Sequence, residues 1–426
     1  MDAAALASAL VFLYYSAMGI VFSWTDVPER ADAADVSSAY SLLRTPERDI
    51  AGRRNVPPHL FIEGDNYPVL RLLSLRQELA GQVRLIYIDP PYNTGKKSFA
   101  YDDARFRIPG TGADADRHSA WLSFMARRLA AARELLREDG CIFIAIGREE
   151  LYHLKLLCDQ IFGEANFVND FMWLHGKGKK DRWSRTMQQS NLCYAKRKKF
   201  LKPFSDWEEA DWARTNPDGD ARGPWFSGSI SFDEARSNPA HRNFYEAVSP
   251  SGVQWRRQWL VPREEFDALA ADGKIYWGAA PAYDGVPRRK IFNGERTKII
   301  PKNIIGGAGT TRSAQRHLDA LLGGRSAFDN PKPAALVRRL LEMTGAEDDA
   351  LVLDFFAGSG TTLEAVSQMN RADGGTRRCI LVQQPEPVSG GTSGAATIAD
   401  ICRERCRRVL EADGAPLECA ALQERQ

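Results

Sequence analysis

The sequence predicts an α/β protein with a mostly parallel central sheet. Three observations lead to this class: short apolar runs alternate with amphipathic segments over residues 46–170, the alternation returns over 326–412, and a stretch of different composition separates the two parts. Alternating strands and helices are typical of a parallel sheet with helices on its faces. We therefore expect both parts to contribute to one sheet, interrupted by an insertion over 171–325.

Composition excludes several other classes of protein. The chain has 426 residues, with 57 Lys and Arg against 55 Asp and Glu and a net charge of +2. This length allows two to three domains of about 100–200 residues, and the near-average composition excludes a disordered, collagen-like or coiled-coil chain. The small net charge excludes a uniformly basic, histone-like protein but leaves a local basic groove open. The 7 cysteines are scattered without a second pair to complete a zinc site, so we expect reduced thiols and a cytoplasmic location.

The N-terminal stretch 3–24 carries no charge and is long enough to cross a bilayer. However, Asp2 precedes it and an acidic segment follows it, whereas a signal peptide or a membrane topology needs a basic flank. We favour an N-terminal extension over 1–45 of undefined role, with a membrane anchor as the less favoured alternative.

The first α/β part contains a strand, a helix and a second strand in succession. Residues 83–89 form an apolar run rich in β-branched and aromatic residues, which predicts a buried strand. Residues 121–139 show the spacing of an amphipathic helix. We expect Gly140 to end this helix and residues 141–147 to form the next buried strand.

Two consecutive prolines follow the first of these strands. They force a rigid, extended turn and cannot donate backbone hydrogen bonds. The Asp89 carboxylate and the Pro90 carbonyl remain as acceptors at the carboxyl end of the strand, where parallel sheets bind ligands. Two acceptors facing one point suit an amino group with two N–H donors, and Tyr92 offers a face on which a planar ring can stack. A purely structural turn is the alternative.

The stretch 171–325 contains eight of the ten tryptophans, frequent Gly, Pro and Asn, and little helical periodicity. Its composition fits two interpretations. One is a separate, small, β-rich domain with a tryptophan core, and the other is an insertion that recognises nucleic acid.

The second α/β part places a glycine turn between a strand and a helix. Residues 350–356 predict a buried strand, 379–384 another strand, and 396–410 a terminal amphipathic helix, followed by a tail over 413–426. Gly358 and Gly360 would let a nucleotide-type cofactor approach the backbone and the helix N-terminus. A tight structural turn is the alternative, because the third glycine of the dinucleotide fingerprint and the Gly-Lys-Ser/Thr of a P-loop are both missing.

Together, IDPPYNTG (88–95) and DFFAGSGTT (354–362) resemble the S-adenosylmethionine-dependent DNA adenine-N6 methyltransferases. The order of the motifs, with an insertion between them, is similar to the permuted β class, which includes the modification subunits of Type III restriction systems. The resemblance covers most of residues 60–410. It implies a Rossmann-like methyltransferase fold with circularly permuted motifs, a first half over 46–170, a target-recognition insertion over 171–325 and a second half over 326–412.

The resemblance also implies roles for individual residues. Asp89 and Pro90 would accept hydrogen bonds from the adenine N6 amino group, Tyr92 would stack on the base, and Pro91 completes the catalytic motif. The residues implied to bind S-adenosylmethionine lie in the glycine turn or in segments predicted to face it; they are Asp354, Phe355, Phe356, Ala357, Gly358, Gly360, Thr361, Lys332, Pro333, Glu386 and Asp65.

A basic run borders the insertion. Between positions 177 and 199 there are nine Lys or Arg and one Asp. A solvated charged face is one explanation, but we favour contacts with DNA phosphates. The predicted DNA-contacting residues are basic side chains in or near the insertion; they are Lys177, Lys179, Lys180, Arg182, Arg185, Lys196, Arg256, Arg257, Arg288 and Arg289.

The resemblance implies methyl transfer to the N6 amino group of an adenine flipped out of duplex DNA, by a solitary enzyme or within a restriction-modification system. The implied partners are double-stranded DNA, a second copy of the chain and a restriction subunit. We expect no metal and no membrane partner, because the chemistry needs no metal and the six histidines show no ligand spacing.

Three alternatives remain. N4-cytosine methylation uses the same amine chemistry, although Asp rather than Ser at position 89 favours adenine. The chain could instead serve chiefly as the DNA-recognition and modification subunit of a restriction complex, since it has no helicase P-loop. A membrane-anchored, non-enzymatic protein rests only on residues 3–24. A C5-cytosine methyltransferase is excluded, because its nucleophilic cysteine follows a proline and no Pro-Cys pair occurs.

Overall fold

The computed structural model describes residues 22–32, 35–95, 106, 114–175, 182–209, 214–388 and 394–425. The chain divides into two compact units, each described by itself. The first combines residues 1–204 and 301–426, and the second is residues 205–300.

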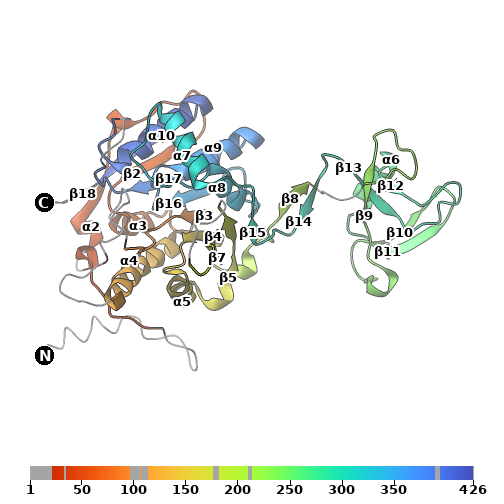
Figure 1. Ribbon diagram of the computed structural model, residues 1–426, viewed down its shortest axis with the longest axis horizontal. Helices are drawn as coiled ribbons and strands as arrows, with labels where there is room; N and C mark the ends of the chain where they lie inside the picture. Colours follow the sequence, from red (N-terminus) through yellow and green to blue (C-terminus); the bar gives the residue numbers. More distant parts are fainter. Residues whose placement is uncertain are drawn as a thin grey trace. The chain divides into compact units, whose positions relative to one another are not determined.

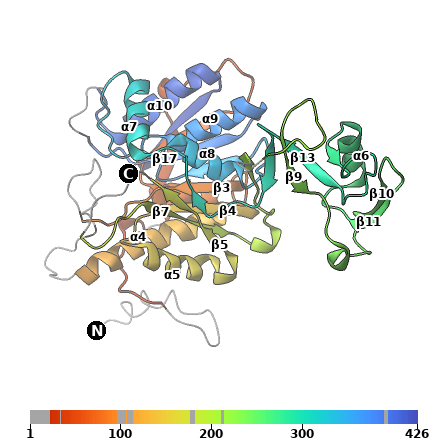
Figure 2. The same ribbon diagram turned by 45° about the vertical axis from the view of Figure 1, so that its right-hand side comes forward.

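A mixed, mostly parallel sheet runs through the first unit, with helices on both faces (Figures 1 and 2). The six adjacent strands from β18 to β4 pair in parallel. Strand β1 pairs antiparallel with β18, and β7 pairs antiparallel with β4, β5 and β6, whereas β6 and β15 pair in parallel. The predicted α/β class is therefore confirmed. In spatial order the strands are β1 (Tyr40–Arg44), β18 (Leu417–Glu424), β2 (His59–Glu63), β17 (Arg378–Gln383), β16 (Leu351–Asp354), β3 (Val83–Ile88), β4 (Leu136–Ile146), β7 (Gln188–Ala195), β6 (Met172–Leu174) and β15 (Ile304–Ile305), with β5 (Phe167–Asp170) also on β7.

The helices form two layers around the central strands. They are α2 (Val36–Ala39), α3 (Asn66–Ser74), α4 (Asp114–Leu135), α5 (Leu151–Phe162), α7 (Thr311–Leu322), α8 (Ala334–Glu342), α9 (Thr361–Asp373) and α10 (Ile398–Asp413), with 3-10 helices η1 (Arg30–Asp32), η2 (Pro46–Arg48), η3 (Glu164–Asn166) and η4 (Lys198–Phe200). Both views show α4 and α5 on one face and α8, α9 and α10 on the other, and α3 packs in the same cluster as α4 and α5.

Strand β3 shows why this arrangement gives a stable core. All six of its residues are buried. Leu85 and Tyr87 pack in the cluster that includes α8, α9 and α10, whereas Ile86 and Ile88 pack in the cluster that includes α3, α4 and α5. Successive side chains of a strand point to opposite faces, so a mostly apolar run, interrupted here by Arg84, fits a strand covered on both sides.

The second unit is small and rich in strands. It contains the pair β8 (Asp206–Glu209) and β14 (Arg296–Ile299), the hairpin β10 (Phe244–Val248) and β11 (Gln254–Gln258), the sheet of β9 (Trp225–Ser229), β13 (Arg288–Phe292) and β12 (Ile275–Tyr276), helix α6 (Arg263–Ala271) and η5 (Glu234–Arg236). Trp259 packs with Ile230, Phe266 and Ile275 in its core, and Trp225 is also buried. The interpretation that tryptophans build a core in this stretch holds for these two residues.

Several expected boundaries differ from the structure. The compact second unit is shorter than the expected insertion over 171–325, because β6, β7, β15 and α7 belong to the first unit. The expected tail over 413–426 is wrong for β18, which lies between β1 and β2 and buries Leu417 and Cys419. Strand β1 likewise takes residues 40–44 of the expected extension into the sheet. These pairings join segments far apart in the sequence, which local patterns do not reveal.

The predicted helix over 121–139 is too long at its C-terminal end. It ends at Leu135, and residues 136–139 are the first part of β4, where Leu136 pairs with Val83. Gly140 therefore lies within a strand and does not end the helix. A Cβ atom at this position would lie 2.9 Å from the carbonyl oxygens of Val83 and Arg137.

Most of the uncharged N-terminal stretch, residues 3–21, lies outside the described residues. At its end, Trp24 is partly buried against the α3–α5 side of the sheet, and its Nε1 donates to Ser123 Oγ at 3.0 Å. Among the described residues, helices that combine the length and the apolarity needed to cross a membrane are absent.

We predict that Gly140→Ala destabilises the first unit by about 1–3 kcal/mol, because the added methyl group meets two backbone oxygens that cannot rotate away. The midpoint of thermal unfolding measures the effect. Gly306→Ala is the control, since a Cβ there meets no atom within 4 Å. Equal midpoints for the two variants would contradict the prediction.

Candidate active site

A pocket opens where β3, β16 and β17 end at the carboxyl edge of the sheet. It has a volume of about 820 Å³ counted with its open mouth. Its walls come from the turn after β3, the segment before α8, the turn between β16 and α9, and the residues after β17. The carboxyl edge of parallel strands is the usual ligand site of such sheets.

The Asp89 carboxylate receives three hydrogen bonds within this site. The Tyr92 hydroxyl donates to Oδ1 at 2.7 Å. The Lys332 ammonium donates to Oδ1 at 2.8 Å and to Oδ2 at 2.7 Å, and its Nζ lies over the Tyr92 ring, 5.1 Å from the centroid. The carboxylate thus already holds a cationic amino group next to an aromatic ring.

The turn that carries Asp89 is fastened to neighbouring elements. The indole of the buried Trp121, in α4, donates to the Pro91 carbonyl at 2.7 Å. Asn93, buried and at a φ of 55°, donates through Nδ2 to the Arg117 carbonyl at 3.2 Å and to Glu150 Oε1 at 2.5 Å. These bonds fix the position of the carboxylate at the end of β3.

A second carboxylate, Asp354, ends β16 and is buried. Burial raises the pKa of Asp354 to about 7, and the negative charge of Asp89 adds to the shift. Two hydrogen bonds oppose this rise in pKa: the Thr362 hydroxyl donates to Oδ2 at 2.5 Å, and the Phe356 amide donates to Oδ1 at 3.0 Å. Asp354 therefore ties the end of the strand to the turn and to the first residues of α9.

The glycine turn places the N-terminus of α9 at the pocket. Gly358 and Gly360 have φ values of 53° and 82°, which favour glycine. A Cβ at Gly358 would lie 3.0 Å from the ring of Phe328, and one at Gly360 would lie 3.2 Å from Cys402 Sγ. The turn therefore has no room for side chains at either position.

Arg405, buried in α10, stabilises this turn through hydrogen bonds. Its Nη1 donates to Ser359 Oγ at 2.9 Å and to Thr361 Oγ1 at 2.8 Å. Its charge is balanced by Glu364, which accepts from Nε at 2.9 Å. The sequence predicted only an amphipathic helix here. The signal that could have indicated this role is that Arg405 falls on the buried face of the helix.

The structure brings together most of the residues that the sequence singled out. Those lining the pocket are Asp89, Pro91, Lys332, Asp354, Phe355, Phe356, Ala357, Gly358, Thr361 and Glu386. Lys332 lines the pocket as expected, but its ammonium binds Asp89. Asn66, Phe124, Phe328 and Gln384 also line it and were not predicted.

Five predicted residues do not line the pocket. Three of them are sequence neighbours of residues that line the pocket; they are Pro90, Tyr92 and Gly360. A fourth, Pro333, is the N-cap of α8. Asp65 lies in a neighbouring cavity. It caps α3 by accepting from the Tyr67 amide at 2.9 Å and pairs with Arg128 at 3.0 Å, so its contacts here are structural.

The predicted DNA-contacting residues divide between the two units. Lys177, Lys179 and Lys180 lie outside the described residues. Lys196 is engaged inside the first unit, where its Nζ donates to the Leu136 carbonyl at 2.7 Å, and Arg288 donates to the Ser227 carbonyl at 3.0 Å. Arg182 and Arg185 are exposed in the first unit and Arg256 in the second, whereas Arg257 and Arg289 are partly buried in the second.

Comparison with known proteins gives consistent results. Residues 83–386 match the family described as DNA methylase. The chain is 34% identical to the Type III restriction-modification enzyme StyLTI Mod subunit of Salmonella typhimurium, over 82% of this chain and 57% of that protein. It is 33% identical to the EcoPI Mod subunit of Escherichia phage P1 (83% and 62%) and 28% identical to the Type II methyltransferase M.KpnI of Klebsiella pneumoniae (82% and 87%). The chain thus spans about three fifths of the two Mod subunits.

We predict that the stability of the protein relative to Asp354→Asn falls as the pH rises from about 4 to about 7. The folded protein holds the Asp354 proton more tightly than the unfolded chain does, because the pKa of Asp354 is raised from 3.8 to about 7. The stabilisation is therefore complete below pH 4 and lost as the pH passes 7, by on the order of 4 kcal/mol.

Urea unfolding of both proteins across this pH range measures the difference. Asp349→Asn, at an exposed position close in the sequence, is the control and should show no such trend. A constant difference between the wild type and Asp354→Asn would contradict the predicted titration.

Proposed function

Because the chain belongs to the DNA methylase family, we propose that it transfers the methyl group of S-adenosylmethionine to the N6 amino group of an adenine in duplex DNA. The observation that carries this proposal is the ion pair of Asp89 and Lys332 beside Tyr92. It supports a site that accepts hydrogen bonds from an amino group next to a stacking surface, which is what an exocyclic amine on a planar base requires.

The pocket beside Asp89 fits S-adenosylmethionine. Its aromatic rings, Phe328 and Phe356, offer surfaces for a purine, and Glu386 offers a carboxylate for ribose hydroxyls. The turn at Gly358, where a Cβ would meet the Phe328 ring, lets a ligand approach the backbone. When bound, S-adenosylmethionine supplies the electrophilic methyl group, and the protein residues supply binding and orientation.

Asp89 makes the target amine more nucleophilic. The lone pair of adenine N6 is delocalised into the ring, so the amine attacks poorly. Hydrogen bonds from the amino group to the Asp89 carboxylate and the Pro90 carbonyl favour a pyramidal nitrogen, whose lone pair can point at the methyl group. Once methylated, the nitrogen is cationic and releases one proton, for which the Asp89 carboxylate is the adjacent acceptor. Holding both reactants in this near-attack geometry lowers the barrier by several kcal/mol, on the order of what well-oriented intramolecular reactions gain. A paired adenine is out of reach, so the base flips out of the helix.

Lys332 and the target amine compete for the same acceptors. Both oxygens of Asp89 are engaged by the Lys332 ammonium, so the incoming amino group must displace it. Lys332 precedes Pro333, the N-cap of α8, and rotation of its side chain would free the carboxylate without moving the sheet.

The relatives named as Mod subunits support a role within a restriction-modification system. We therefore propose duplex DNA as substrate and a restriction subunit and a second copy of the chain as partners, in the cytoplasm. The second unit, residues 205–300, is proposed to recognise the target sequence, with Arg256 exposed on it. N4-cytosine methylation is the second candidate, because M.KpnI is named only as a methyltransferase and the site chemistry serves either amine.

The test is methyl transfer from labelled S-adenosylmethionine to duplex DNA of mixed sequence, followed by digestion and mass spectrometry of the nucleosides. N6-methyldeoxyadenosine would support the proposal. N4-methyldeoxycytidine would replace the adenine assignment by the second candidate. Bound cofactor without any methylated base would contradict the proposed activity of the isolated chain. Repeating the reaction with a restriction subunit added would then show whether this partner is required.

We predict that Asp89→Ala lowers the methyl-transfer rate at least 100-fold, in the range seen when a group that handles the reacting proton is removed. The affinity for S-adenosylmethionine, measured by calorimetry, should change less than threefold, roughly 0.6 kcal/mol. Asp349→Ala, exposed in the same unit, is the control. Turnover of Asp89→Ala close to that of the control would rule out this mechanism.

We also predict that Arg405→Lys weakens S-adenosylmethionine binding about tenfold. Lysine can still pair with Glu364, but it loses the two hydrogen bonds to Ser359 and Thr361 that shape the glycine turn, each of which contributes about 0.5–1.5 kcal/mol. Arg407→Lys, on the same helix with only surface partners, should bind normally. If both variants bind alike, Arg405 does not position the turn.

A further inference from the structure

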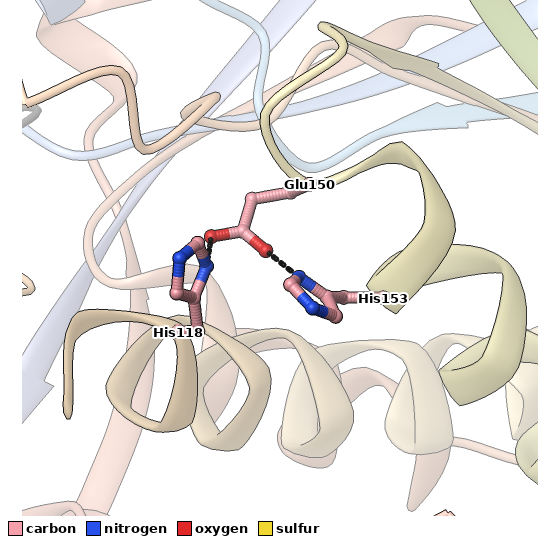
Figure 3. A group of neighbouring side chains, drawn as sticks. All are labelled: His118, Glu150 and His153. Carbon is pink, nitrogen blue, oxygen red and sulfur yellow. Dashed lines mark hydrogen bonds and ion pairs between the residues drawn. The ribbon is translucent and has the colours of Figure 1, made fainter. Parts of the chain in front are cut away.

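Two histidines and a glutamate converge outside the pocket, at the junction of α4 and α5 (Figure 3). His118 Nδ1 lies 2.6 Å from Glu150 Oε1, and His153 Nδ1 lies 2.7 Å from Glu150 Oε2. His118 belongs to α4, Glu150 is the N-cap of α5, and His153 lies in the first turn of that helix. The potential ligand atoms all lie within 4.8 Å of one another.

The spacing of the histidines in the sequence did not indicate this group, because His118 lies 32 residues before Glu150. Glu150 and His153 are three residues apart, a Glu-x-x-His spacing that puts both side chains on one side of a helix, as in carboxylate-bridged metal proteins. His118 is distant in the sequence and is added by the packing of α4 against α5 (Figure 3).

The chemistry of the three side chains suits a divalent transition metal. Imidazole nitrogen and carboxylate oxygen are the ligands of open Zn²⁺ sites, at about 2.0–2.2 Å from the ion. Ligand atoms of a tetrahedral site then lie about 3.3 Å apart, so the present N–O contacts would widen by a little over half an ångström. The His118 and His153 side chains are 25% and 39% exposed, which leaves an entry path and room for a water ligand.

The glutamate is held by an outer partner. Glu150 is fully buried, and its Oε1 also accepts from Asn93 Nδ2 at 2.5 Å. Carboxylates that bind metals are commonly oriented by such a second hydrogen bond. A buried carboxylate also gains from a nearby positive charge, because burial disfavours its ionised form. Here the outer partner is the residue directly after Tyr92.

We propose that His118, Glu150 and His153 form a binding site for a divalent transition-metal ion, with Zn²⁺ as the best match. The ion joins the N-terminal part of α4 to the start of α5 and, through Asn93, fastens the turn that carries Asp89. The site lies apart from the methyl-transfer chemistry, which needs no metal. Metal binding itself does not depend on the proposed function, whereas a regulatory role of the ion on Asp89 rests on it.

The first experiment measures Zn²⁺ alone, without DNA or S-adenosylmethionine. The full chain is stripped with a chelator and titrated with Zn²⁺ in competition with a chromophoric chelator. We expect one Zn²⁺ per chain and binding at least tenfold weaker in His153→Ala and in His118→Ala. His241→Ala, in the second unit, and His317→Ala, whose ring has a single carboxylate partner, are matched controls that should retain the wild-type affinity.

Two results would overturn the site: no stoichiometric Zn²⁺ binding by the stripped wild type, or equal affinity in His153→Ala and the two controls. In either case the three side chains only hydrogen-bond one another. Circular dichroism of every variant shows whether a loss of binding reflects unfolding, and Co²⁺ absorption spectra in place of Zn²⁺ report the coordination directly in folded protein.

The link to the Asp89 turn is tested by hydrogen exchange. Zn²⁺ should slow amide exchange in peptides spanning residues 86–95 at least fivefold in the wild type. Asn93→Gly keeps the backbone free to adopt the φ of 55° but removes the amide that reaches Glu150. It should still bind Zn²⁺ and lose this protection. Identical exchange with and without Zn²⁺ in the wild type would refute the link to the turn.

Discussion

The burial of the central strands on both faces is the constraint on which the rest of the first unit depends. Strands β3 and β16 are buried along their whole length, and their backbone groups are used in the parallel ladder. Polar side chains are costly there unless they are paired. Arg84, in the middle of β3, is paired with the Thr344 carbonyl and with Glu347, whereas Asp89 and Asp354 lie where the strands end. The position of the pocket is thus a consequence of how the sheet is covered.

The two carboxylates at this edge differ because their surroundings differ. Asp89 is paired with the ammonium of Lys332 and with a phenol, and its side chain is partly exposed. Asp354 is buried without a cation, which raises its pKa to about 7, and it receives only hydrogen bonds from neutral groups. The first is arranged to accept hydrogen bonds from a ligand, whereas the second holds the glycine turn in shape.

The local parts of this site could be predicted from the sequence, and the non-local parts could not. The apolar run before Asp89 and the glycines after β16 are signals within a few residues, and both elements occur where they were predicted. The hydrogen bonds of Arg405 to the glycine turn, the addition of β18 to the sheet and the meeting of His118 with Glu150 each join segments 32 or more residues apart. At Gly140 a local signal gave a wrong prediction. Glycine often ends helices, but this one lies in β4, which is held in place by pairing with β3.

The Asp89–Lys332 pair has a consequence for selectivity, given the proposed function. An ammonium tethered next to its acceptor competes at an effective concentration of about millimolar or more, so free nucleosides and small amines at lower concentrations are kept out. A base in DNA that is already bound to the protein is also tethered, so its effective concentration near Asp89 is comparable to that of the Lys332 ammonium. The enzyme would then need no further element to exclude free adenine compounds, because the Lys332 ammonium outcompetes them for the Asp89 carboxylate.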